Sequence, residues 1–222
     1  PSTGKTVKFR PFLVKEEKVL LMALESEDEK QVIGAVKDLL KNCIISRIKV
    51  DSLPSFDLEY LFLKIRAASI GEIIQLTVTC LDDNKTEVEA TININQIEVF
   101  KPEGHDAKIM FDEKTGIVMK YPSMKQFVER EFLQKDMKTE DVYDFIAESI
   151  DQIFDEDEVY DSSTTTKKEF RTFVDGLTTK QFEKIQQFYI TAPKLRHQFT
   201  VTNPNTGKES EYTLEGLQSF FA

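Results

Sequence analysis

The chain has 222 residues, of which 40% are hydrophobic and 31% are charged, and its formal net charge is −10. This composition is that of a globular protein, and the length suffices for one large core or two modest ones. The acidic balance argues against binding to nucleic acid, because affinity for phosphates comes largely from lysine and arginine. No run approaches the roughly 18 apolar residues of a membrane span, so we expect no stable membrane association.

The two cysteines, Cys43 and Cys80, lie far apart in apolar surroundings. This usage does not resemble the dense disulfide framework of small secreted domains and favours a reducing compartment.

Residues 1–70 form a predicted helical N-terminal part. Apolar residues at helical spacing predict a first helix that ends near Ser26. Asp28 is placed to cap a second helix with a core-facing stripe, and a third helix is expected between Ser55 and Gly71.

Residues 71–121 form a predicted β-hairpin region. One hairpin is expected from residues 73–80 and 86–92, with Val88, Ala90 and Ile92 on one face, and a second from residues 108–111 and 117–121.

Residues 122–193 form a predicted C-terminal helical part. The helical period returns at Met124, Phe127, Val128 and Phe132, and again from Thr139 to Ile153. Residues 155–166 are acidic and then rich in serine and threonine, which predicts a mobile loop or the tip between two helices. Further helices are expected at residues 167–176 and 178–191.

Residues 194–222 form a predicted third hairpin, at residues 197–202 and 210–213, followed by a short amphipathic helix at residues 214–221. We expect this part to pack with residues 71–95. The predicted fold class is therefore α+β, mostly helical, with two or three short antiparallel β-hairpins.

Two of these hairpins share one sequence design. Residues 76–85, LTVTCLDDNK, align without gaps with residues 199–208, FTVTNPNTGK, and share a Thr-Val-Thr strand and a lysine after the turn. The alternative is coincidence, since threonine and valine are common in strands and asparagine and glycine in turns.

The turns also have the spacing of zinc knuckles, which place one cysteine at the strand end and another three residues later. Those positions hold Cys80 and Asp83 in one hairpin and Asn203 and Thr206 in the other. Structural zinc requires four thiolate or imidazole ligands, so we expect no zinc here. The hypothesis is a degenerate zinc-ribbon-like module whose metal has been replaced by packing and turn chemistry.

Catalytic residues are not evident in the sequence. The two histidines, His105 in a polar linker and His197 at a strand start, fit surface or turn positions better than proton transfer. Neither thiol has an adjacent histidine or helix N-terminus that would lower its pKa. We therefore expect no enzyme activity, no catalytic residues, no metal and no cofactor.

Aromatic residues gather at the two ends of the chain. We predict that Phe9, Phe12, Leu13, Phe220 and Phe221 dock into a partner protein. The alternative is that these side chains pack on the chain's own core.

Four segments resemble the baseplate hub proteins of T4-type contractile-tailed phages: residues 8–18, KFRPFLVKEEK, residues 53–57, LPSFD, residues 64–66, KIR, and residues 119–122, MKYP. The likeness spans nearly the whole chain, and the first segment is the most specific. Some relatives carry cysteine pairs at the hairpin turns, and this chain departs from them at Asp83, Asn203 and Thr206.

The resemblance implies a viral protein made in the cytoplasm of a host bacterium. It would build the baseplate hub or central spike through contacts with other hub proteins, either as a subunit of the virion or as an assembly chaperone that leaves. The alternative function is a catalytic assembly factor or hydrolase that acts on hub components.

Overall fold

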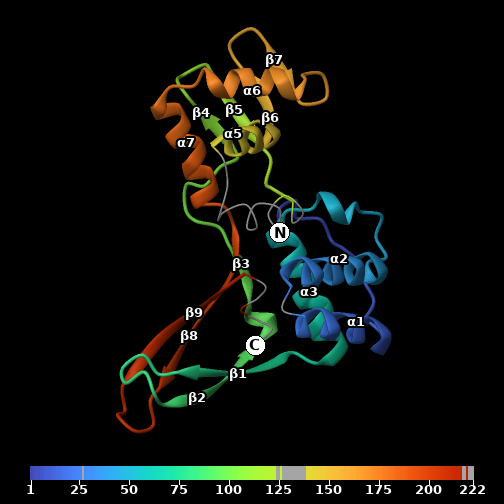
Figure 1. Ribbon diagram of the computed structural model, residues 1–222, viewed down its shortest axis with the longest axis vertical. Helices are drawn as coiled ribbons and strands as arrows, with labels where there is room; N and C mark the ends of the chain where they lie inside the picture. The colour runs from blue at the N-terminus through green and yellow to red at the C-terminus, as the bar shows by residue number, and fades with distance from the viewer. Residues whose placement is uncertain (27, 124–125, 127–138, 217–218, 220–222) are drawn as a thin grey trace. The chain divides into compact units, whose positions relative to one another are not determined.

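The computed structural model describes residues 1–26, 28–123, 126, 139–216 and 219 (Figure 1). The chain divides into two compact units. The first unit combines residues 1–100 with residues 193–222, and the second unit is the intervening segment, residues 101–192.

The first unit begins with three helices, α1 (Val14–Glu25), α2 (Glu29–Cys43) and α3 (Ser55–Ile70). The residues predicted to start α2 and to end α3 do so. The Asp28 carboxylate accepts hydrogen bonds from the backbone N–H groups of Lys30 and Gln31, which caps α2. α3 ends at Gly71, whose φ of 116° lies outside the range that other residues adopt readily.

Two antiparallel sheets complete the first unit. β1 (Ile73–Thr79) pairs with β2 (Glu87–Asn93), and a second sheet has the order β3 (Glu98–Phe100), β8 (Lys194–Thr202), β9 (Glu209–Glu215). Short 3₁₀ helices precede α3 and β3, at Val50–Ser52 and Ile94–Gln96. Ala90 and Ile92 are buried on one side of β2, as the alternation of its sequence predicts.

The β1–β2 and β8–β9 turns share one backbone hydrogen bond and one left-handed residue. The N–H of Asn84 donates to the carbonyl of Cys80, and the N–H of Gly207 donates to the carbonyl of Asn203, each four residues back. Asn84 and Gly207 occupy the same left-handed conformation, with φ of 54° and 73°. The gapless alignment of the two sequences pairs these same residues, so the likeness of the hairpins extends to backbone conformation.

The two turns also contact one another, near one end of the first unit (Figure 1). The side-chain amide of Asn203 donates to Asp82 Oδ1 at 2.8 Å and to Asp83 Oδ2 at 3.1 Å. Thr206 donates to Asp82 Oδ2 at 2.6 Å. We call these four residues the turn clasp, which joins segments about 120 residues apart in the sequence.

The zinc-ribbon hypothesis finds no support in this arrangement. The described residues contain no group of three or more histidine, cysteine, aspartate or glutamate side chains that could hold a metal ion. Burial, and then the charges of Asp82 and Asp83, raise the pKa of the Cys80 thiol and favour its protonated form. Three of the four positions compared with metal ligands, Asp83, Asn203 and Thr206, instead take part in the hydrogen bonds of the turn clasp.

The second unit packs helices against a four-stranded antiparallel sheet. The sheet has the order β4 (Lys108–Met110), β5 (Gly116–Met119), β6 (Ile150–Phe154), β7 (Val159–Asp161). The helices are α5 (Thr139–Glu148), α6 (Lys167–Asp175) and α7 (Thr179–Ile190). One apolar core joins sheet and helices, including Ile117, Ile150, Phe170, Ile185 and Phe188.

Two predictions for the second unit are wrong. The helix expected to reach Ile153 ends at Glu148, and residues 150–154 form β6. Pairing with β5 and β7 overrides the helical spacing of Ile150 and Ile153. The expected loop at residues 155–166 contains β7. Asp155 closes the β6–β7 turn by accepting hydrogen bonds from the N–H groups of Asp157 and Glu158, and Val159 and Tyr160 continue as a strand.

The terminal helix predicted from residue 214 is also wrong at its start. Leu214 lies in β9, where it pairs with His197. The other predicted helical residues Met124, Phe127, Val128 and Phe132 lie outside the described residues, as do Phe220 and Phe221. The α+β class with small antiparallel sheets is confirmed.

The turn clasp makes a prediction about stability. Asn203→Asp would place a third carboxylate, fully buried, against Asp82 and Asp83 and remove the donor that satisfies both. We expect the melting temperature at neutral pH to fall by roughly 5 °C or more. Asn95→Asp adds the same charge at an exposed site and should have little effect. Equal melting temperatures for the two variants in thermal denaturation would contradict the role of the clasp.

Candidate protein-binding surface

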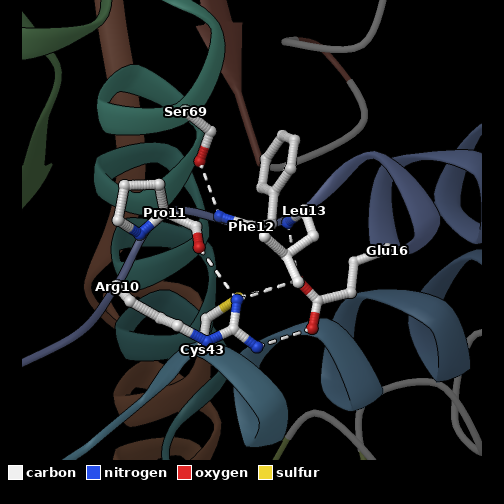
Figure 2. A network of polar contacts seen from close by, with 7 residues as sticks. All are labelled: Arg10, Pro11, Phe12, Leu13, Glu16, Cys43 and Ser69. Atoms are coloured by element: carbon white, nitrogen blue, oxygen red, sulfur yellow. Dashed lines mark hydrogen bonds and ion pairs between the residues drawn. The ribbon is translucent and has the colours of Figure 1, made fainter.

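The N-terminal segment is fixed beside the helices by the guanidinium group of Arg10 (Figure 2). This group contacts both carboxylate oxygens of Glu16, at 2.7 and 3.0 Å, and also donates to the carbonyl of Pro11. Its third contact is the Cys43 sulfur at 3.7 Å, so residues from the N-terminal segment, α1 and α2 meet at one point. A bidentate pair of this kind fixes orientation as well as distance.

Glu16 also caps α1 from within the helix. Its Oε2 accepts a hydrogen bond from the N–H of Leu13 at 2.7 Å, which satisfies a donor at the helix start. The Arg10 guanidinium, followed by this backbone donor, lowers the Glu16 pKa to about 2. Glu16 is buried, with 8% of its surface exposed, and stays ionised because both interactions favour the charged form.

The predicted docking residues near the N-terminus have different environments. Phe12 is 8% exposed, and its N–H donates to Ser69 Oγ in α3 at 3.0 Å, so its ring belongs to the core of the first unit. Phe9 is half-buried in a short β-bridge with Ile44. Leu13 is 52% exposed. Of these three residues, Leu13 offers the most surface to a partner.

The outward side of α1 was missed as a candidate surface in the sequence. Leu20 and Ala23 face the core, yet several apolar side chains of α1 are exposed. We call this set the outer α1 surface: Val14 (81% exposed), Val19 (54%), Leu21 (52%) and Met22 (59%). A helix with apolar residues on both sides is typical of one that is covered on both sides. The sequence contains a signal for this surface, because α1 has more apolar residues than one buried side requires.

The two histidines occupy packed positions within their own units. His105, expected in a surface linker, is instead buried at 6% exposure in the second unit. Thr191 Oγ1 donates its proton to the Gln187 carbonyl and therefore accepts a hydrogen bond from Nδ1 of His105. With the proton on Nδ1, Nε2 of His105 accepts a hydrogen bond from the Tyr121 hydroxyl. Burial lowers the pKa of His105 and favours this neutral tautomer.

His197 lies in β8 and stacks on Phe199, and burial lowers its pKa as well.

None of the described helices is both long and apolar enough to cross a membrane.

An exposed apolar helix surface of this kind is typical of sites where proteins contact one another. The family model described as T4 bacteriophage base plate protein matches residues 1–222. The chain therefore belongs to this family of phage baseplate proteins. No curated protein and no solved structure matches the chain.

The Arg10–Glu16 pair makes a second prediction. Glu16→Gln would leave a charged guanidinium facing a neutral amide and should lower the free energy of unfolding by about 2 kcal/mol, measured by urea denaturation at pH 7. Because the folded-state pKa of Glu16 is lowered, its contribution is present above about pH 4.5 and is lost as the pH falls toward about 2. The difference between wild type and variant should therefore shrink in acid, and a pH-independent difference would contradict this assignment.

Proposed function

We propose that the chain is a non-catalytic component of the baseplate hub, which acts in the assembly of the hub or central spike through contacts with neighbouring baseplate proteins. Membership of the baseplate family supports a place in the phage tail. On this proposal the protein is made in the cytoplasm of the host bacterium and meets its partners there during assembly.

The observation that carries the proposal is the outer α1 surface. Four large apolar side chains at solvent-exposed positions of one short helix are unfavourable in isolation, because each leaves apolar area in contact with water. Removal of about 100 Å² of such area from water stabilises a complex by about 2.5 kcal/mol. Lys15 and Lys18 are also exposed and lie among these apolar residues, so the surface offers polar contacts as well.

The Arg10–Glu16 pair has a clear role in this proposal. It fixes the start of α1, so that Leu13 and Val14 lie at the exposed end of the helix rather than on a frayed terminus. A rigid apolar helix loses little conformational entropy on binding, which favours affinity.

The test is a double substitution on the outer α1 surface. Val14→Asp combined with Met22→Asp should reduce co-purification of baseplate proteins with the tagged full-length chain by at least about tenfold, the equivalent of 1.4 kcal/mol. The melting temperature should change little, because both side chains are exposed.

The matched control is Ile190→Asp, which adds a charge at an apolar residue of α7 that is 68% exposed. This variant should co-purify with baseplate proteins as the wild type does. Unchanged co-purification for the α1 double variant would refute the proposed surface, and a large fall in its melting temperature would assign Val14 and Met22 to the chain's own fold.

A further inference from the structure

The strand register extends the likeness of the two hairpins beyond the strands and turns compared in the sequence. In β1–β2, Gln75 lies opposite Thr91, Thr77 opposite Glu89, and Thr79 opposite Glu87. In β8–β9, Gln198 lies opposite Thr213, Thr200 opposite Glu211, and Thr202 opposite Glu209. The same three cross-strand pairs therefore occur in the same order in both hairpins.

These repeated residues are all solvent-exposed, whereas the residues between them differ. The inward positions hold Ile74, Leu76 and Val78 in β1 but His197, Phe199 and Val201 in β8. In β2 and β9 they hold Val88, Ala90 and Ile92 against Ser210, Tyr212 and Leu214. The hairpins thus share three of their four outward pairs, and the exception is Ile73–Asn93 against Arg196–Glu215. They share their inward residues at one position of six.

This distribution is the reverse of what packing alone would produce. Inward residues of a repeat are constrained by the core, whereas an exposed strand position tolerates most polar residues at a cost within about 0.5 kcal/mol. General strand preference explains the threonines, but it does not explain glutamate at the first two exposed positions of each return strand, because glutamate is depleted in strands. A shared binding requirement explains both.

The two hairpins also contact each other through the inward side of β9. Tyr212 is an inward residue of β9, and its hydroxyl donates to the Thr79 carbonyl of β1 at 2.6 Å, so the inward side of one hairpin faces the other hairpin. The turn clasp holds the hairpins in this arrangement. The module therefore presents two copies of one polar surface, one on each hairpin.

Over the three repeated pairs, each surface carries two glutamates, flanked by threonines and a glutamine, and ends at a single lysine after the turn, Lys85 or Lys208. The excess of carboxylates at each surface is complementary to lysine or arginine on a partner.

We propose that the two hairpins are twin docking surfaces that bind two copies of one partner subunit, each through basic side chains opposite a glutamate pair. The chain thereby bridges two identical subunits. This inference rests on the proposed role as a contact protein, but it uses surfaces other than α1.

Carbodiimide cross-linking provides the direct test, because it joins a carboxylate to a lysine amine only where the two are in contact. The tagged full-length chain is purified with its baseplate partners, cross-linked and digested for mass spectrometry. We expect Glu87 or Glu89, and also Glu209 or Glu211, to be joined to the same lysine-containing peptide of one partner protein. Links to peptides of two different proteins, links only within this chain, or no links at all would overturn the proposal.

Stoichiometry provides an independent test by native mass spectrometry of the same complex. The wild type should bind two copies of the cross-linked partner. Glu87→Lys with Glu89→Lys, and Glu209→Lys with Glu211→Lys, should each reduce this number to one. The control, Glu113→Lys with Glu183→Lys, makes the same change of charge at exposed residues of the second unit and should retain two copies.

Circular dichroism checks that each double variant is folded, and Glu→Gln pairs at the same positions replace any variant that is not. One partner copy on the wild type, or two copies on both hairpin variants, would overturn the proposal. Loss of co-purification in the α1 variant tests the proposed function separately, since the twin surfaces remain intact there.

Discussion

The hydrogen bonds of one buried amide hold the architecture of the first unit together. Asn203 donates to Asp82 and Asp83 across about 120 residues of sequence, and so joins the hairpin that follows α3 to the hairpin that precedes the C-terminus. Residues 101–192, which lie between these hairpins in the sequence, form the second unit. Closing a loop of this length costs only slightly more entropy than closing a shorter one, so a few well-placed hydrogen bonds and the buried strands suffice.

A neutral amide suits this position better than a charged residue. The carboxylates of Asp82 and Asp83 would repel one another, and donors from Asn203, Thr206 and Thr86 satisfy them, which lowers the pKa of both. These donors therefore hold the two turns together through hydrogen bonds between side chains. The same arrangement fixes the two outward surfaces relative to each other, and the proposed bridging of two subunits depends on it.

The Arg10–Glu16 pair has a comparable role at α1. Glu16 accepts the hydrogen bond of a backbone N–H at the start of the helix from the buried side. The residues on the outward side are therefore not needed to cap the helix. Stable local geometry beneath an exposed apolar surface is the combination that a contact protein requires. The two proposed binding regions differ in chemistry, since the outer α1 surface is apolar and the hairpin surfaces are polar and acidic. They are therefore suited to different partner surfaces.

The sequence by itself determined the elements with local signals. Asp28 and Thr178 mark helix starts through side-chain caps, Gly71 marks a helix end, and the Thr-Val-Thr strands with their turns mark the repeated hairpins. These features depend on interactions within a few residues, which is why they can be predicted. The family resemblance was likewise present in the sequence and is confirmed over the whole chain.

Only the tertiary structure decided the features that depend on partners distant in sequence. Isoleucine spacing could not assign residues 150–154, because pairing with β5 rather than local preference makes them a strand. Phe12 is held by its contact with Ser69 in α3. His105 is held by Tyr121, Phe188 and Thr191. The likeness of the two outward hairpin surfaces became visible only from the cross-strand register. The two turns differ in length, so a gapless alignment that matches β1 with β8 does not match β2 with β9.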